Sequence, residues 1–261
     1  MRICRLCAHP LADGRARCDS CSAWNFGASD ADIPSDDGSV LYEDIDEKEI
    51  ARISTGLLDD CLGGGCVLSD VILLGGLPGG GKSTLMLQLC VTFCKLGTVL
   101  YIAAEEDIRT IKLRGQRLNI KTRGNLRFLA ALSGVANIGA LLLVRKPRFI
   151  IVDSIDSLSG GDDAVELEIL KALKKFCVEL NAPALVVSRI NKAGDYSGLL
   201  DKQHEVDVLL VIEATEYTPD DSPEPIRMIQ SLKNRSGRAY VRSFFEMTEA
   251  GLVSTLDPEA G

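Results

Sequence analysis

Residues 71–84 read VILLGGLPGGGKST, an apolar run followed by a glycine-rich turn and the start of a helical pattern. The turn fits the pattern G-x-x-x-x-G-K-[ST] of a phosphate-binding loop, in the strand-to-helix context that such a loop requires. Glycines let backbone N–H groups turn toward phosphate, and the helix N-terminus adds partial positive charge. The pattern predicts that nucleotide is bound by Gly76, Pro78, Gly79, Gly80, Gly81, Lys82, Ser83 and Thr84.

Three side chains, two from the loop and one from a later strand, are expected to complete its chemistry. Lys82 is predicted to reach the β- and γ-phosphates of ATP, and Ser83 to ligate Mg²⁺. A second carboxylate on the metal side belongs at the end of a buried strand, and the run RFIIVDS supplies Asp153 there. Asp153 could instead cap the following turn, and Asp156 is its nearest rival.

Hydrolysis also needs a group that orients or deprotonates the attacking water. The run YIAAEE ends a predicted strand with two carboxylates, of which Glu105 is the preferred candidate. Ligands of open α/β sheets bind outside the carboxyl ends of the strands, so its placement favours a role. A plain surface pair of Glu105 and Glu106 is the alternative.

The surrounding sequence alternates short apolar runs with helical patterns, which is typical of βαβ units and a parallel sheet. We therefore predict the α/β class, with a mainly parallel sheet flanked by helices. The predicted helices span 82–95 and 163–180, and the predicted strands span 71–75, 99–103, 149–153, 184–188, 206–213 and 226–233.

The nine cysteines fall into two groups. The spacing C-x2-C-x10-C-x2-C near the N-terminus predicts a structural Zn²⁺ site with ligands Cys4, Cys7, Cys18 and Cys21. The others lie in apolar surroundings and are expected to be buried as small hydrophobic residues. The predicted domains are a zinc-binding module at 1–27, an acidic linker at 28–52 and an ATPase domain at 53–261.

Charge and hydropathy limit the classes of partner. The net charge of −8 argues against binding nucleic acid over the whole surface, so any DNA contact is expected to be local. A basic run from Arg109 to Arg127 fits either such a contact or a solvated helix face. No apolar run approaches the roughly 20 residues of a membrane span, and no signal peptide is evident, so we expect a cytoplasmic protein without a membrane partner.

The motifs together resemble the RadA (Sms) family of bacterial DNA-repair ATPases, which are related to RecA and to replicative helicases. The resemblance covers nearly the whole chain, through the cysteine module, the phosphate-binding loop, residues 105–106, 111–114 and 153–155, and the run KNRSG at 233–237. It implies a RecA-like fold, the cofactors ATP, Mg²⁺ and Zn²⁺, and single-stranded or branched DNA as a partner. It also implies a ring-shaped homo-oligomer, expected to be a hexamer, and possible contact with a recombinase or replication protein.

The resemblance also implies roles for residues that composition and spacing leave open. Lys233 and Arg235 match basic residues that point at the γ-phosphate of a neighbouring subunit, and Arg189 occupies the position of a polar nucleotide sensor. The segment 191–203 matches a DNA-binding loop, with Lys192 and Lys202 as candidate phosphate contacts.

Three departures from the family pattern affect this interpretation. The chain ends at Gly261, before a protease-like C-terminal domain, so no proteolytic role is expected. The loop at 159–163 is short and acidic, and Ser236 replaces an aromatic residue. A nucleotide-gated binding module without translocation is therefore an alternative. A metal-dependent nuclease, suggested only by the acidic pairs at 59–60 and 162–163, is another.

Overall fold

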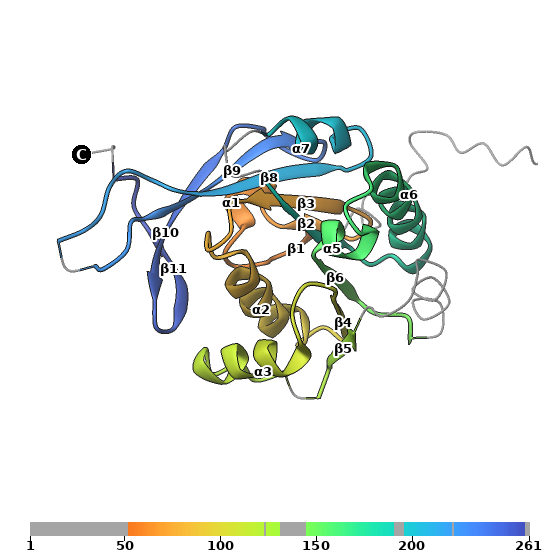
Figure 1. Cartoon of the computed structure of the whole chain (residues 1–261), viewed down its shortest axis with the longest axis horizontal. Coiled ribbons are helices and arrows are strands. Elements are labelled where there is room, and N and C mark those ends of the chain that lie inside the picture. Colours follow the sequence, from red (N-terminus) through yellow and green to blue (C-terminus); the bar gives the residue numbers. More distant parts are fainter. Residues whose placement is uncertain (1–51, 123, 131–144, 191–195, 221, 259–261) are drawn as a thin grey trace, which may run out of the picture. The chain divides into compact units, whose positions relative to one another are not determined.

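A nine-stranded sheet with helices on both faces organises the described part of the chain (Figure 1). The computed structural model describes residues 52–122, 124–130, 145–190, 196–220 and 222–258. All of them belong to one unit, Ile50–Gly261. The strand order is β11-β10-β9-β8-β3-β7-β6-β4-β5, and β1 pairs with β2 in a separate two-stranded sheet. The α/β class predicted from the alternation of apolar runs is therefore confirmed.

The bounds of the elements follow the chain in order. The strands are β1 (Arg52–Ile53), β2 (Cys66–Val67), β3 (Val71–Gly76), β4 (Val99–Ala103), β5 (Leu126–Ala130), β6 (Phe149–Asp153), β7 (Ala184–Arg189), β8 (Val208–Ala214), β9 (Arg227–Asn234), β10 (Arg242–Thr248) and β11 (Gly251–Thr255). The helices are α1 (Asp59–Leu62), α2 (Lys82–Phe93), α3 (Ile108–Arg117), α5 (Ile155–Ser159), α6 (Asp163–Leu180) and α7 (Ser197–Lys202).

The sheet is parallel from β5 to β8 and antiparallel from β8 to β11. All six predicted strands are present with ends within two residues of their expected positions. The strands that carry the phosphate-binding loop and the candidate carboxylates, β3, β4 and β6, are buried along their whole length. Burial on both faces is the usual state of parallel strands, which explains their continuous apolar runs.

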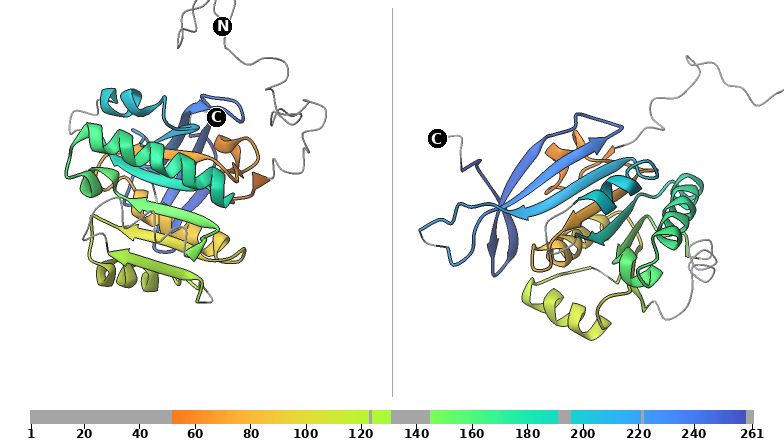
Figure 2. Two further views of the ribbon diagram at one scale, coloured as in Figure 1. Left: turned by 90° about the vertical axis from the view of Figure 1, so that its right-hand side faces the viewer. Right: turned by 45° about the horizontal axis from the view of Figure 1, so that its top comes forward.

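Helices cover both faces of the sheet, as the two views in Figure 2 show. Two apolar clusters hold them there. α2 packs against one face, where Phe93 stacks on Phe149 with ring centroids 3.7 Å apart. α6 packs against the other face through residues that include Ile169 and Leu173. A buried Leu or Phe stabilises the fold by roughly 1.5–3 kcal/mol, so the paired clusters supply the main driving force for this arrangement.

Local signals set the ends of the two long helices. Gly81 precedes α2 with φ +100°, a left-handed conformation that glycine adopts without strain. Asp162 caps α6 by accepting hydrogen bonds from the N–H groups of Ala164 and Val165. Asn181 ends α6 in the left-handed region, which Asn tolerates better than most residues.

The cysteines of the described region are free and buried, as the apolar context predicts. They are Cys61, Cys66, Cys90, Cys94 and Cys177. Burial raises the pKa of Cys177 to about 12, which keeps this thiol protonated and unreactive at neutral pH. No helix among the described residues is long and apolar enough to span a bilayer.

Candidate nucleotide site

The phosphate-binding loop joins β3 to α2 at the carboxyl end of the parallel strands. Gly76 lies so close to β8 that an added Cβ would meet the Ile212 carbonyl oxygen at 2.7 Å. At Gly81 an added Cβ would meet Met247 Cε at 2.8 Å. Close packing therefore requires glycine at position 76, whereas at positions 79 and 81 the left-handed backbone conformation favours it.

Lys82 lies folded over this loop with only 9% of its surface exposed. Its Nζ donates to the carbonyl oxygens of Gly76 at 2.6 Å and Leu77 at 2.8 Å. Burial lowers the pKa of Lys82, while the nearby carboxylates of Glu105 and Asp153 oppose that effect. An ammonium group held by neutral carbonyl oxygens can exchange them for phosphate oxygens, which are stronger acceptors.

Asp153 ends β6 beside the loop, and its carboxylate is almost fully buried. The Tyr101 hydroxyl of β4 donates to Oδ2 at 2.5 Å, and the Ser83 hydroxyl also hydrogen-bonds to this carboxylate. Burial raises the pKa of Asp153, and these two hydroxyls partly offset the rise. A buried carboxylate whose hydrogen-bond partners are neutral hydroxyls favours a cation, so the donor set of Ser83 and Asp153 fits Mg²⁺.

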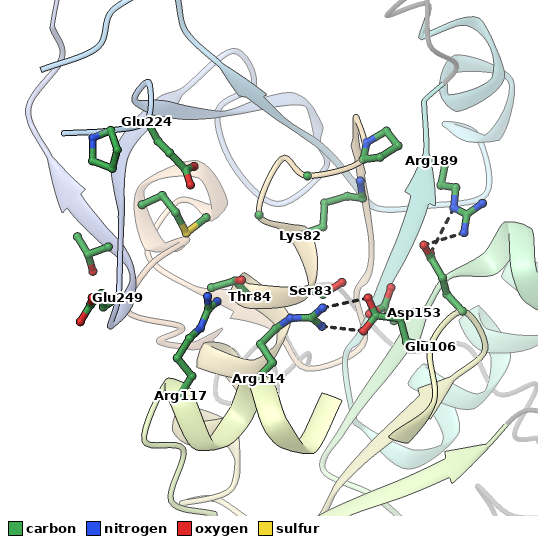
Figure 3. A pocket seen from close by; sticks show the side chains of 17 residues that line it. Lys82, Ser83, Thr84, Glu106, Arg114, Arg117, Asp153, Arg189, Glu224 and Glu249 are labelled. Atoms are coloured by element: carbon green, nitrogen blue, oxygen red, sulfur yellow. Dashed lines mark hydrogen bonds and ion pairs between the residues drawn. The ribbon is translucent and has the colours of Figure 1, made fainter. Parts of the chain in front are cut away.

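Two ion pairs cross the mouth of the site. The Arg189 guanidinium at the end of β7 lies 2.7 Å from Glu105 Oε1 and 3.3 Å from Oε2. Arg114 of α3 donates two bonds of 2.9 Å to Glu106 (Figure 3). Burial alone would raise the pKa of Glu105, but Arg189 holds it below its ordinary value. The two adjacent carboxylates thus have different partners.

Asp156, the rival of Asp153, has a different position. Its carboxylate accepts from the Arg189 N–H at 2.9 Å and from the Ser188 hydroxyl at 3.3 Å, so it fastens the end of β7. The residues that line the cavity include Asp153 but not Asp156. The geometry therefore favours Asp153 as the carboxylate beside the phosphate-binding loop.

A cavity of about 610 Å³ opens over the loop and brings these groups together. It contains most of the predicted site but adds residues that sequence reasoning missed (Figure 3). Those additions come from the β4–α3 connection, from α3, from the β8–β9 connection, and from the end of β10 with the turn after it: Glu106, Arg114, Arg117, Pro223, Glu224, Met247, Thr248 and Glu249.

The missed arginines belong to the basic run that was interpreted as a DNA contact or a solvated helix face. Arg114 and Arg117 are three residues apart, which places both on one face of α3. That face borders the nucleotide cavity, where Arg114 pairs with Glu106 and Arg117 remains exposed, so both residues are also candidates for the nucleotide site. The capping signal of Asp107 before an apolar residue could have indicated the helix and its register.

Lys233 and Arg235 do not line this cavity. They lie at the end of β9, beside the start of β8, whereas the phosphate-binding loop follows the carboxyl end of β3. Lys233 Nζ donates to the carbonyl oxygens of Gln203 and Val206, the latter at 2.8 Å. Arg235 lies 3.4 Å from Asp207 and keeps a side chain that is 54% exposed.

The candidate DNA contact Lys202 is corrected by the structure. Its ammonium group is buried and forms an ion pair with buried Glu166, while Asp163 lies 3.6 Å away. A buried ammonium with two carboxylate neighbours is not available to a DNA phosphate. Lys192 lies outside the described residues, as do the four predicted zinc ligands Cys4, Cys7, Cys18 and Cys21.

The acidic pairs that suggested a nuclease have structural partners. Asp59 accepts from the Thr55 N–H at 2.6 Å and from the hydroxyls of Ser54 and Thr55, and Asp162 caps α6. Within the ranges that the structure describes, no three His, Cys, Asp or Glu side chains group together to hold a metal ion. The observation that motivated a nuclease therefore has another explanation.

The fold and site define a P-loop nucleotide-binding protein, and comparison with known families agrees. Residues 58–195, more than half of the chain, match the family described as AAA domain, so the chain belongs to that family. A KaiC-like protein from Pyrococcus horikoshii shares the fold with a TM-score of 0.65 at 18% identity, over 79% of this chain and 100% of that protein.

The particular relatives are proteins named DNA repair protein RadA, and the resemblance inferred from the motifs is confirmed. The relative from Aquifex aeolicus is 30% identical over 274 residues, 99% of this chain. The relative from Campylobacter jejuni is 32% identical over 279 residues, 97% of this chain. The chain spans about 60% of the length of these curated relatives.

Proposed function

We propose that this chain is a Mg²⁺-dependent ATP hydrolase that couples turnover to translocation or branch processing on single-stranded or branched DNA. The observation that carries the proposal is the convergence of Lys82, Asp153 and Glu105 around one cavity at the end of the phosphate-binding loop. The relatives named for DNA repair support the DNA substrate.

The side chains have complementary roles in this proposal. Lys82 binds the β- and γ-phosphates, while Ser83 and Asp153 hold Mg²⁺, which neutralises charge that develops on the phosphates. Glu105 orients and deprotonates the attacking water, and Arg189 senses the γ-phosphate from the end of β7. Because Arg189 pairs with Glu105, a phosphate that draws Arg189 away would release the carboxylate to act on water.

Ring assembly supplies the remaining cations. Lys233 and Arg235 lie at the opposite end of the sheet from their own loop, so a role at a γ-phosphate requires a neighbouring subunit. A cation inserted by the neighbour stabilises charge in the transition state and makes hydrolysis depend on assembly. A hexameric ring with an N-terminal zinc module held by Cys4, Cys7, Cys18 and Cys21 completes the proposed protein.

The steady-state ATPase rate with and without single-stranded DNA, at two salt concentrations, tests this function. We expect stimulation that weakens with added salt, because phosphate contacts release counterions. The variant Lys82→Ala should lower turnover by about 10²–10³-fold, the usual effect of losing a cation aimed at transition-state charge. The matched control is Lys95→Ala, which removes an exposed lysine just beyond the other end of the same helix and should leave the rate unchanged.

The second candidate function is a nucleotide-gated binding or loading module without translocation. The Arg189–Glu105 pair favours it, because a site whose candidate base is already paired with a cation hydrolyses slowly until a partner opens it. A slow rate that DNA does not change, together with nucleotide-dependent binding of a protein partner, would support this alternative over the first.

A further inference from the structure

Tyr240 has an unusual backbone conformation, and it does not line the nucleotide cavity of its own chain. It has φ +63°, and it is the one aromatic residue with positive φ among the described residues. A bulky side chain in the left-handed region is a genuine outlier. Its side chain is also 72% exposed, so burial does not compensate for the strained backbone.

The backbone around Tyr240 forms a β-bulge at the start of β10. The N–H of Tyr240 donates to the Ser231 carbonyl oxygen at 2.6 Å, and the Ser231 N–H donates to the Val241 carbonyl oxygen at 3.0 Å. Two residues of one strand therefore face one residue of β9, with the first in the left-handed conformation. Glycine usually occupies that position. Strained residues of this kind cluster at functional contacts, where the surrounding structure holds them in place.

The turn that carries Tyr240 is basic and leads directly from Lys233 and Arg235. Arg238 and Arg242 lie on either side of Tyr240 in the chain and are exposed. The ion pair of Arg235 with Asp207 and the bulge hydrogen bonds fix this turn to the sheet. An exposed tyrosine with arginines two positions away on either side in the chain has the composition of an interface hot spot.

The outer wall of the nucleotide cavity has complementary chemistry. Glu249 supplies a carboxylate, as does Glu224, which is paired with Arg227 at 2.6 Å. Pro223 and Met247 supply apolar surface, and Arg117 lines the same cavity. A methionine sulfur and an arginine guanidinium both pack favourably against an aromatic ring. The negative charge of the acidic groups beside these contacts is complementary to the positive charge of the arginines of the turn.

We propose that Tyr240 of one copy packs against the outer wall of the nucleotide cavity of a neighbouring copy, so that each site is completed by its neighbour's turn. This inference rests on the proposed function, because it requires the ring in which Lys233 and Arg235 act across subunits. It adds the aromatic contact that seats the turn. It also gives the chain an aromatic residue near the position where Ser236 departs from the family pattern.

Subunit mixing tests the proposal. Tyr240→Gly removes the aromatic side chain and relieves the strain of the left-handed backbone, so the thermal unfolding midpoint of the variant should not fall. Its self-association should weaken by roughly 30-fold, as for a hot-spot truncation. Its ATPase rate should fall with assembly. When Tyr240→Gly is mixed with Lys82→Ala, whose turn is intact, the turnover of the mixture should rise well above the sum of the turnovers that the two variants show separately. Tyr240→Phe should retain the wild-type rate.

Two controls separate failure of this inference from failure of the proposed function. Arg235→Ala mixed with Lys82→Ala reports on trans completion itself, and wild type mixed with Lys82→Ala sets the attainable rate. If the Arg235→Ala mixture recovers while Tyr240→Gly alone is fully active, the inference fails and the function stands. If Tyr240→Gly is inactive and mixing with Lys82→Ala does not restore turnover, the inference also fails. A loss of affinity for single-stranded DNA in that variant would then indicate that the turn contacts DNA.

Discussion

Arg189 and Glu105 form a two-point ion pair at the mouth of the nucleotide cavity, with Nη2 2.7 Å from Oε1. Arg189 ends β7 and Glu105 follows the last residue of β4 by two positions, and β6 separates these two strands in the sheet. The contact therefore links the candidate sensor directly to the candidate base. A change at one residue must alter the proton affinity of the other.

Arg189→Ala should move the acid limb of the ATPase pH profile to higher pH. Arg189 holds the pKa of Glu105 below its ordinary value, so its removal raises that pKa. A base must be ionised to act, and the rate then falls at a higher pH than in wild type. We also expect kcat to drop on the order of tenfold, since the γ-phosphate loses the arginine that senses and positions it. The measurement is kcat/KM for ATP across the acid range.

The control for this experiment is Arg109→Ala, which removes a guanidinium that is 90% exposed and pairs with Asp107 at 3.7 Å. Its profile should overlay the wild-type curve. An unmoved acid limb in Arg189→Ala would rule out Glu105 as the titrating base.

Tyr101→Phe should lower the affinity of the site for Mg²⁺ without unfolding the protein. The lost hydroxyl is one of two that offset the effect of burial on the pKa of Asp153, so the carboxylate becomes a poorer ligand. Loss of a partner behind a metal ligand typically costs about 10–100-fold in affinity. The Mg²⁺ concentration for half-maximal rate should rise by about tenfold. Tyr217→Phe, at an exposed tyrosine, is the matched control.

The sequence predicted the parts of this site that depend on continuous local patterns. The buried strands β3, β4 and β6 appear as apolar runs because both of their faces are covered, and the glycine motif specifies its own loop. β5 was missed because its residues are only partly buried or exposed, which leaves a weak apolar signal. The β10 and β11 strands were missed for a similar reason, since most of their residues are incompletely buried.

Pairings across the sheet could not be predicted from one sequence. Glu105 and Arg189 are 84 positions apart, and only the strand order brings them together. Lys202 was assigned to a DNA contact from its position in a loop, but tertiary packing buries it against Glu166. Charge alone does not distinguish a solvated lysine from a buried one.

Asp70→Asn should stabilise the protein at neutral pH and have no effect near pH 4. Burial, followed by repulsion from Asp207, raises the pKa of Asp70 to about 6 from its ordinary value of 3.8. The folded protein therefore binds more protons between these values, and stability falls as pH rises through that window. The full difference in the pKa of Asp70 corresponds to at most about 3 kcal/mol of unfolding free energy. We expect Asp70→Asn to gain about 1–2 kcal/mol because of solvent screening.

Thermal unfolding of wild type and Asp70→Asn at pH 4 and pH 7.5 checks the direction of this stability change. The variant should unfold a few degrees higher at pH 7.5, at about 2–4 °C per kcal/mol for a domain of this size. Asp60→Asn makes the same charge change at an exposed position and is the matched control. A gain that persists at pH 4 would mean that the carboxylate does not titrate as described.

Lys202 and Glu166 should behave as a coupled buried pair. Lys202→Met or Glu166→Leu alone leaves one buried charge without its partner, which typically costs 3–5 kcal/mol. The double variant removes both charges and should recover most of that loss, and denaturant unfolding of the three proteins measures the coupling. Additive losses would show that the pair contributes nothing.

The same variants test whether Lys202 contacts DNA, as its position in the sequence had suggested. A phosphate contact would make Lys202→Met bind single-stranded DNA more weakly and would reduce the slope of log K against log salt by about 0.7. Since the ammonium group is enclosed by Glu166 and Asp163, we expect the double variant to keep both the affinity and the slope of wild type. The restored fold makes the double variant the decisive protein, because a DNA defect there could not be attributed to unfolding.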